Sequence, residues 1–225
     1  MNIKVSGVGS VANGEYEHVS LHGNVKLFGL VKCKSLTARG KARGEQIVCD
    51  KNIKAAGSGT FTGKVTAQEI KASGHYTFGS DVIAQNSLHC AGNVKCTGDM
   101  EAEKIKIRGC LQCEGLLNAE DFDVKFDSTT RLGSVGGKKI SIRLKLMQKI
   151  LQCIAIFPLF IRKWRARTHV KFAVEGDDIF MNHTVCPRVT VKNVCIGRGC
   201  NIDLVQYNET VKISKNSKVG KVEKI

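Results

Sequence analysis

The feature that most constrains this chain is a repeat of about 17 residues that runs from Ile3 to Leu144. Four residues after each of the first seven unit openings stands a glycine: Gly7, Gly23, Gly40, Gly57, Gly74, Gly92 and Gly109. The units open on aliphatic or aromatic residues, at Ile3, Val19, Leu36, Ile53, Ile70, Leu88, Ile105, Phe122 and Ile140. A fixed period of this length is typical of a repeat architecture in which each unit is one structural element.

Within one unit, apolar and polar side chains alternate as they do in short β-strands. In the fourth unit, Ile53 and Ala55 flank a lysine, Phe61 lies between two threonines, and Val65 and Ala67 flank another threonine. Glycines near the fifth and eleventh places mark tight corners. Each unit therefore predicts three short strands joined by corners, which is one coil of a β-solenoid.

Stacking the units aligns their inward residues into columns that fill a narrow core. The expected columns are Val31, Val48, Val65, Val82, Met100 and Leu117; Ala67, Ala84, Ala102 and Ala119; and Leu27, Gly44, Phe61, Phe78, Cys96 and Cys113. One coil cannot fold alone, because its strands find hydrogen-bond partners only in neighbouring coils. We predict an all-β fold, a right-handed parallel β-helix. A left-handed hexapeptide helix would suggest an acyltransferase, but it needs about 18 residues in every coil.

The repeat stops after Leu144, and a segment of different composition follows. Of the net charge of +15, eight Lys or Arg and no Asp or Glu lie between Arg143 and Lys171. Apolar residues cover most of a helix from Leu144 to Phe157, and Pro158 ends or kinks that helix. We therefore divide the chain into N-terminal coils (1–142), a basic amphipathic helical insertion (143–170), and C-terminal coils with a tail (171–225).

Two roles compete for this insertion. One is a cap over an open end or side of the solenoid; the other is docking on an anionic membrane surface, since the apolar run is too short to span a bilayer. Nucleic acid is the third and weakest alternative partner. The expected contact residues are Leu144, Met147, Ile150, Leu151, Ile154, Phe157, Phe160, Trp164, Arg162, Lys163, Arg165 and Arg167.

Strand-like alternation returns after Phe172 and predicts two or three further, less regular coils. We expect the residues from Lys215 to Ile225 to fray, because they are basic. The inward pairs expected in these coils are Val189 and Val191, Val194 and Ile196, Ile202 and Leu204, and Val211 and Ile213.

Ten cysteines without an N-terminal signal peptide predict reduced thiols in the cytoplasm. Cys90, Cys96 and Cys113 fall on inward columns, where a free cysteine acts as a small buried hydrophobe. Cys110 and Cys113 have the spacing of half a zinc site, but the repeat turns their side chains in opposite directions and no second pair follows. We expect no metal site.

Three other patterns suggest chemistry, and the repeat accounts for them. The stretch 57–64 is similar to a phosphate loop, but its glycine spacing is one residue too long. Asp177 and Asp178 are adjacent on a strand and so face opposite sides. The six histidines occupy mostly outward places: His18, His22, His75, His89, His169 and His183. We expect no enzyme activity, no catalytic residues, no cofactor and no small-molecule substrate.

Four kinds of motif carry a resemblance to a known family. They are the IKAAG and IKASG openings at Ile53 and Ile70, GLLNAEDFDV at 115–124, VEGDDIF at 174–180, and IGRGCNIDLVQY at 196–207. In these motifs, and over nearly its whole length, the chain resembles the bactofilins, bacterial polymer-forming cytoskeletal proteins, and is similar to their longer firmicute-type members. The resemblance implies a right-handed triangular β-helix that stacks end to end into filaments without nucleotide.

The resemblance also implies membrane association and scaffold roles in cell shape, envelope synthesis or motility. We expect a cytoplasmic protein, peripheral on the inner membrane, whose partner is a second copy of itself or a paralogue. From the residues, the expected polymerisation interface is the open N-terminal end, at Ile3, Val5, Val19 and Leu21. The alternative function is a monomeric β-solenoid that binds a partner protein or nucleic acid through the basic segment 143–171.

Overall fold

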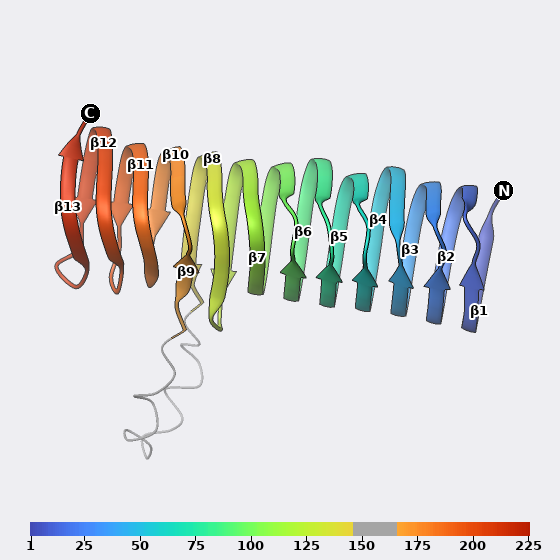
Figure 1. Cartoon of the computed structure of the whole chain (residues 1–225). Helices are drawn as coiled ribbons and strands as arrows, with labels where there is room; N and C mark the ends of the chain where they lie inside the picture. The colour runs from blue at the N-terminus through green and yellow to red at the C-terminus, as the bar shows by residue number, and fades with distance from the viewer. Residues whose placement is uncertain (146–165) are drawn as a thin grey trace, which may run out of the picture.

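A computed structural model describes residues 1–145 and 166–225 and confirms the parallel β-solenoid, in about 12 turns of about 17 residues (Figure 1). All strand pairs are parallel, and no helix occurs in the described residues. The strands are β1 (Ile3–Val11), β2 (Gly14–Leu27), β3 (Leu30–Gly44), β4 (Gln46–Phe61), β5 (Val65–Phe78), β6 (Val82–Cys96), β7 (Met100–Phe126), β8 (Thr130–Leu144), β9 (Thr168–Val170), β10 (Ala173–Met181), β11 (Thr184–Ile196), β12 (Asn201–Ile213) and β13 (Lys218–Lys224).

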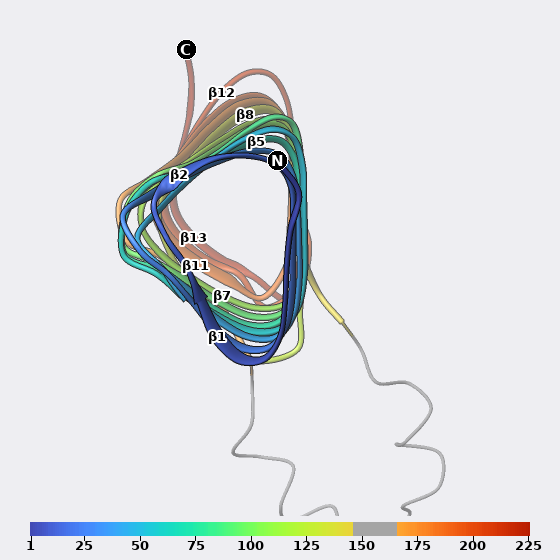
Figure 2. The ribbon, with the colours of Figure 1, turned by 90° about the vertical axis from the view of Figure 1, so that its right-hand side faces the viewer.

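The register confirms the predicted repeat. Ile3 pairs with Val19, Leu36 pairs with Ile53, and the same column continues coil by coil along the solenoid. It also continues across the interruption, because Ile140 pairs directly with Ile179. Viewed along the axis, the coils superpose as a rounded triangle (Figure 2). The chain is therefore one continuous stack, and the predicted C-terminal coils extend the N-terminal ones.

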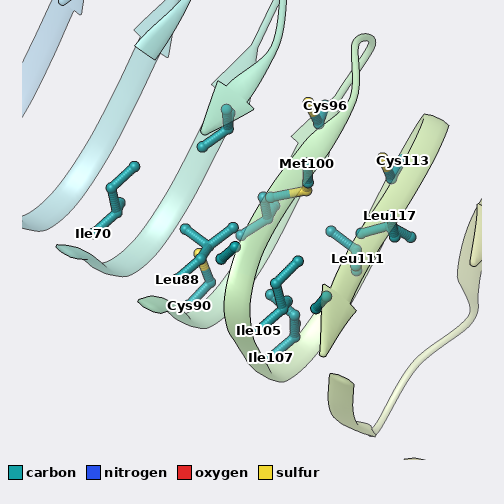
Figure 3. Packing of buried hydrophobic residues seen from close by; sticks show 14 of the residues in the cluster. Ile70, Leu88, Cys90, Cys96, Met100, Ile105, Ile107, Leu111, Cys113 and Leu117 are labelled. Carbon is teal, nitrogen blue, oxygen red and sulfur yellow. The ribbon is translucent and has the colours of Figure 1, made fainter. Parts of the chain in front are cut away.

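The core is a set of columns, as the period predicts, with one register error in the N-terminal coils. Val65 pairs with Val82, and Val82 with Met100, all of them buried; Figure 3 shows Met100 beside Leu117 and Cys113. The prediction that Val48 belongs to this inward column is wrong. Ile47 is the buried residue there, and Val48 is half-buried and pairs with an outward lysine. The corner before Ile47 is one residue shorter than the average period requires.

Cysteines fill core positions, as expected. Cys90 pairs with Ala72, and Cys96 lies between Phe78 and Cys113 in register; all three cysteines are buried free thiols. Burial raises the pKa of the Cys90 thiol to about 12, so this side chain is neutral at any physiological pH. The Cys90 sulfur therefore behaves as apolar filler rather than as a nucleophile.

The interruption begins and ends at different residues from those predicted. Leu144, expected to begin a helix, is the last residue of β8; it pairs with Phe126 and packs against the core. Thr168–Val170, expected to belong to the insertion, form β9 between β8 and β11. The described part of the solenoid wall therefore ends at Lys145 and resumes at Ala166, and the rest of the helix predicted for 144–157 lies outside the described residues.

Two expectations for the C-terminal coils are wrong. Val205, rather than Leu204, is the buried partner of Val189, because Leu204 pairs with the outward Arg188. The end of the chain does not fray: β13 pairs with β12 from Lys218 to Lys224. Its backbone hydrogen bonds depend on a neighbouring coil and not on the charge of its side chains.

Candidate assembly ends and a basic face

The N-terminal end of the solenoid is the open edge of β1. This strand pairs with β2 on one side, and no described strand lies on the other. Ile3 and Val5 are half-buried against the core, Val8 is 87% exposed, and Lys4 is the only charged residue of the strand. An edge of unpaired N–H and C=O groups beside apolar side chains is the arrangement to which another strand adds.

Two of the four residues predicted for the polymerisation interface do not lie at this edge. Val19 and Leu21 belong to the second coil, where they pair with Ile3 and Val5 and are 2% and 1% exposed. The first coil covers them, because each coil shields the apolar column of the next one. Only Ile3 and Val5 of that set face the open end.

The C-terminal end has a different character. Ile213 of β12 and Val222 of β13 are 41% and 42% exposed, and neither has a described strand beyond it. Lysines occupy every third position of β13, at Lys218, Lys221 and Lys224. Lysines on an edge strand oppose the addition of a further strand. The C-terminal edge is therefore unpaired, but its lysines disfavour strand addition.

The residues predicted to contact a membrane or to form a cap are mostly beyond what the structure describes. Of the two that it describes, Leu144 packs against the core, and the carbonyl of Arg167 accepts a hydrogen bond of 3.0 Å from the Thr130 backbone N–H. Both belong to the solenoid wall. The others fall within 146–165: Met147, Ile150, Leu151, Ile154, Phe157, Phe160, Arg162, Lys163, Trp164 and Arg165.

One flat side of the solenoid is strongly basic. It is formed by two outward columns, at the second and fourth places of each unit, which we call the basic face. The register places these columns along the whole solenoid, from β1 to β12. They contain one acidic residue, Asp123, and nine basic ones: Lys4, Arg39, Lys54, Lys71, Lys106, Arg108, Lys125, Arg143 and Lys212.

The one carboxylate of the basic face is already neutralised. Asp123 accepts hydrogen bonds of 2.9 Å from Arg108 and 3.0 Å from Arg143, and its side chain is 13% exposed. Burial disfavours its charged form, but the hydrogen bonds from Arg143 and Arg108 outweigh burial and hold the pKa of Asp123 below its usual value. Asp123 therefore stays ionised, and Arg108 and Arg143 balance its charge. It does not offset the other cations of the basic face.

The side of the solenoid between the units' thirteenth and seventeenth places distributes its charges differently; we call it the mixed face. There, lysines of one coil pair with carboxylates of the coil before it, as in Lys32–Glu15 at 3.0 Å, Lys138–Glu120 at 2.6 Å and Lys192–Asp177 at 2.9 Å. The same coil spacing therefore pairs lysines with carboxylates on the mixed face, whereas six of the nine basic residues of the basic face have no carboxylate partner among the described residues.

Small side chains hollow out the centre of the basic face. Ala56, Ser73 and Ala91 are register neighbours in the fourth-place column. Above them lies an open groove of about 620 Å³ that crosses β3 to β7, with Arg39 and Arg108 as its outermost basic residues. The second-place column lines the groove between them with three lysines and a histidine: Lys54, Lys71, His89 and Lys106. Burial and the neighbouring lysines lower the pKa of His89, which favours its neutral form.

The patterns set aside in the sequence lie in ordinary solenoid positions. The stretch from Gly57 to Phe61 is part of β4, and Asp177 pairs with Lys192. Cys110 is half-buried while Cys113 is buried, as their predicted opposite directions require. Within the described ranges, no three His, Cys, Asp or Glu side chains come together as a metal site.

Sequence reasoning missed the basic face, which appears only when the columns are read for charge instead of apolarity. The sequence contains the necessary signal, which is the recurrence of lysine and arginine at the second and fourth places of the repeat. The register that aligns the core also aligns these side chains. Residues 1–145 and 166–225 contain no helix that could cross a bilayer. No protein-family model, curated protein or solved structure matches the chain.

Proposed function

We propose that this protein is a scaffold subunit that assembles end to end into filaments without a nucleotide. One observation supports it: both terminal coils expose strand edges whose apolar columns continue those of the core. A second molecule stacked on β1 would make the backbone hydrogen bonds that neighbouring coils make inside the solenoid. No nucleotide is needed, because the junction repeats contacts that already hold the molecule together.

The resemblance to the bactofilins supports the same function. We infer a bactofilin-like cytoskeletal protein with right-handed coils, placed at the inner face of the cell membrane and serving cell shape, the envelope or motility. The segment 146–165 is the candidate membrane contact. The family, the hand of the coil and this location stay predictions.

The two ends differ in how readily they join. The edge strand β1 carries one lysine, whereas β13 carries Lys218, Lys221 and Lys224. A junction that brings β13 against another C-terminal end sets lysine against lysine, which screening by salt relieves. We therefore expect filaments to lengthen as salt is raised, in contrast to an assembly held by ion pairs.

The test is electron microscopy and sedimentation of the full chain in plain buffer. Filaments are expected without ATP or GTP and with EDTA present. Ile3→Lys with Val5→Lys should reduce them to short species, because two charges then lie on the open apolar column. Val8→Lys is the matched control: it adds a lysine to the same strand at a side chain that already points outward, and should assemble normally.

Circular dichroism separates loss of assembly from loss of folding. The Ile3→Lys, Val5→Lys variant should keep the β-sheet spectrum of the wild type, since only the first coil is changed. Wild-type protein that stays monomeric at high concentration, at every salt level, would overturn the scaffold proposal. Filaments that survive the double substitution would show that the N-terminal edge is not a junction.

A further inference from the structure

The groove on the basic face keeps cations that its own chain does not neutralise. Lys54 and Lys71 are direct register neighbours, and like charges placed directly opposite each other on a sheet destabilise it. Lys71 has a carboxylate at 3.3 Å, from the half-buried Glu69. In the described part of the chain, Arg39, Lys54 and Lys106 have no carboxylate within ion-pairing distance. The mixed face shows that this fold can pair its charges, so the three unpaired cations Arg39, Lys54 and Lys106 point to an external anion.

The charged groups of the groove are all hydrogen-bond donors. Its polar groups are ammonium and guanidinium ions, a histidine and the hydroxyls of Thr37 and Ser73. The floor is a sheet face, so its backbone groups are already used in the ladders between coils. A ligand that brings anionic acceptor groups therefore fits these donors best.

The shape of the groove indicates that its ligand is a linear chain. From Arg39 to Arg108 the groove crosses five neighbouring strands, a length of about 19 Å at ~4.8 Å per strand. It runs along the solenoid axis with a cation on nearly every coil. No Phe, Tyr or Trp lines it, so it has no platform on which a nucleic-acid base would stack.

We propose that this groove binds an unbranched phosphate polymer, laid along the solenoid axis with its phosphates on Arg39, Lys54, Lys71 and Lys106. The class includes inorganic polyphosphate and phosphodiester-linked polyols, which share the chemistry of repeated phosphate without bases. An anionic bilayer fits less well, because Ala56, Ser73 and Ala91 are recessed and the groove offers no large apolar side chain to insert. This inference does not depend on filament assembly.

The probe is fluorescently labelled inorganic polyphosphate, with binding followed by anisotropy. The full chain is used both as wild type and as the Ile3→Lys, Val5→Lys variant, so that binding is measured with and without assembly. Four phosphate contacts predict a loss of affinity of about 50-fold between 50 and 200 mM salt. Orthophosphate at the same total phosphate should compete weakly, because it makes one contact at a time.

A charge-matched pair of variants locates the site. Lys54→Glu with Lys106→Glu should weaken binding about 30-fold or more at low salt. Lys26→Glu with Lys95→Glu makes the same change in net charge at exposed lysines in another outward column, and should bind within about threefold of wild type. A third variant, Ala56→Leu with Ala91→Leu, fills the groove floor without changing charge and should weaken binding about tenfold.

Each outcome decides the proposal. Equal losses in the two charge variants would mean that net charge alone attracts the polymer, which overturns the site. A preference for single-stranded DNA over polyphosphate would replace the proposed ligand by nucleic acid. Binding to phosphatidylglycerol vesicles that depends on Lys54 and Lys106, without polyphosphate binding, would assign the face to a membrane. Phosphodiester polyols that bind more tightly than polyphosphate would identify the second source of the same chemistry.

Discussion

At the scale of single residues, the glycine column shows most directly why the repeat is strict. All seven glycines have φ between 85° and 127°, a range that other residues rarely adopt. A Cβ on Gly74 would also overlap the backbone carbonyl oxygen of Gly57 in the coil beneath it. The corner therefore needs glycine twice over, for its backbone angle and for the close approach of the next coil.

The first glycine separates these two requirements. A Cβ on Gly7 would meet no atom within 4 Å, because no described coil lies beyond it, although its φ is 85°. We expect Gly7→Ala to destabilise the protein by about 1–2 kcal/mol, from the backbone angle alone. Gly74→Ala should cost more than about 4 kcal/mol, since the overlap forces the backbone to move. Denaturant unfolding of the two variants measures the difference, and equal effects would contradict the stacking explanation.

The same scale shows where a period read from sequence loses accuracy. An average period predicts inward places well in coils with regular corners, as for Val65 and Val82. It fails where a corner gains or loses a residue, as at Val48 and Leu204, because a shift of one residue turns a strand side chain from the core to solvent. Hydrophobicity alone could not resolve Ile47 from Val48, or Leu204 from Val205, because both members of each pair are aliphatic.

At the scale of elements, the interruption lies in one corner and leaves the sheet intact. Lys145 donates its backbone N–H to the Phe126 carbonyl at 2.6 Å, and β9 is held between β8 and β11 after the chain returns. In regular coils one glycine turns this corner. The sequence revealed the interruption by its composition, but its bounds were misjudged, because Leu144 and Thr168 continue the strand pattern with side chains that suit either structure.

Removing residues 146–165 tests this view. With a short glycine linker in their place, we expect the β-sheet spectrum to persist and the melting temperature to change by only a few degrees, because both flanks are anchored in the sheet. If the segment is the membrane contact, the shortened protein should no longer co-sediment with anionic vesicles. Met147→Glu with Ile154→Glu in the full chain is the matched test. Vesicle binding that persists in both variants would exclude this segment as the contact.

At the scale of the whole molecule, each coil contacts mainly the coil before it and the coil after it. Stability is then roughly a sum of coil terms and neighbour terms, without a single central core. Such a molecule should tolerate the loss of a complete coil, because the two new neighbours present the same columns to each other. It should not tolerate the loss of half a coil, which places inward residues against outward ones.

Deleting residues 70–87 joins Glu69 to Leu88 and brings Ile53 into register with Leu88. We expect this variant to fold with an unchanged β-sheet spectrum and a melting temperature lower by several degrees. Deleting residues 70–78 instead removes half a coil and should abolish cooperative unfolding. Thermal melts of both variants decide the matter, and a folded half-coil deletion would refute the stacked register.

The whole-molecule scale also explains what could not be read from the sequence. The fold followed from local alternation and one period, both of which are visible in the chain. The basic face depends on residues from every coil, such as Lys54, Lys71 and Lys106, and each looks like an ordinary solvated lysine by itself. Only the register, once fixed, shows that they form one surface.

The uniform rise of the coils fixes the axial length of this molecule. Twelve turns at ~4.8 Å set a length of about 58 Å, fixed by the number of repeats rather than by any side chain. If the ends join as proposed, each subunit contributes one interrupted corner to the polymer. The distance between successive corners along the filament is then set by the length of the subunit. Partners bound to the segment 146–165 would then lie at regular intervals along the filament. Adding or removing one coil would change the length of each subunit by the spacing between two neighbouring strands.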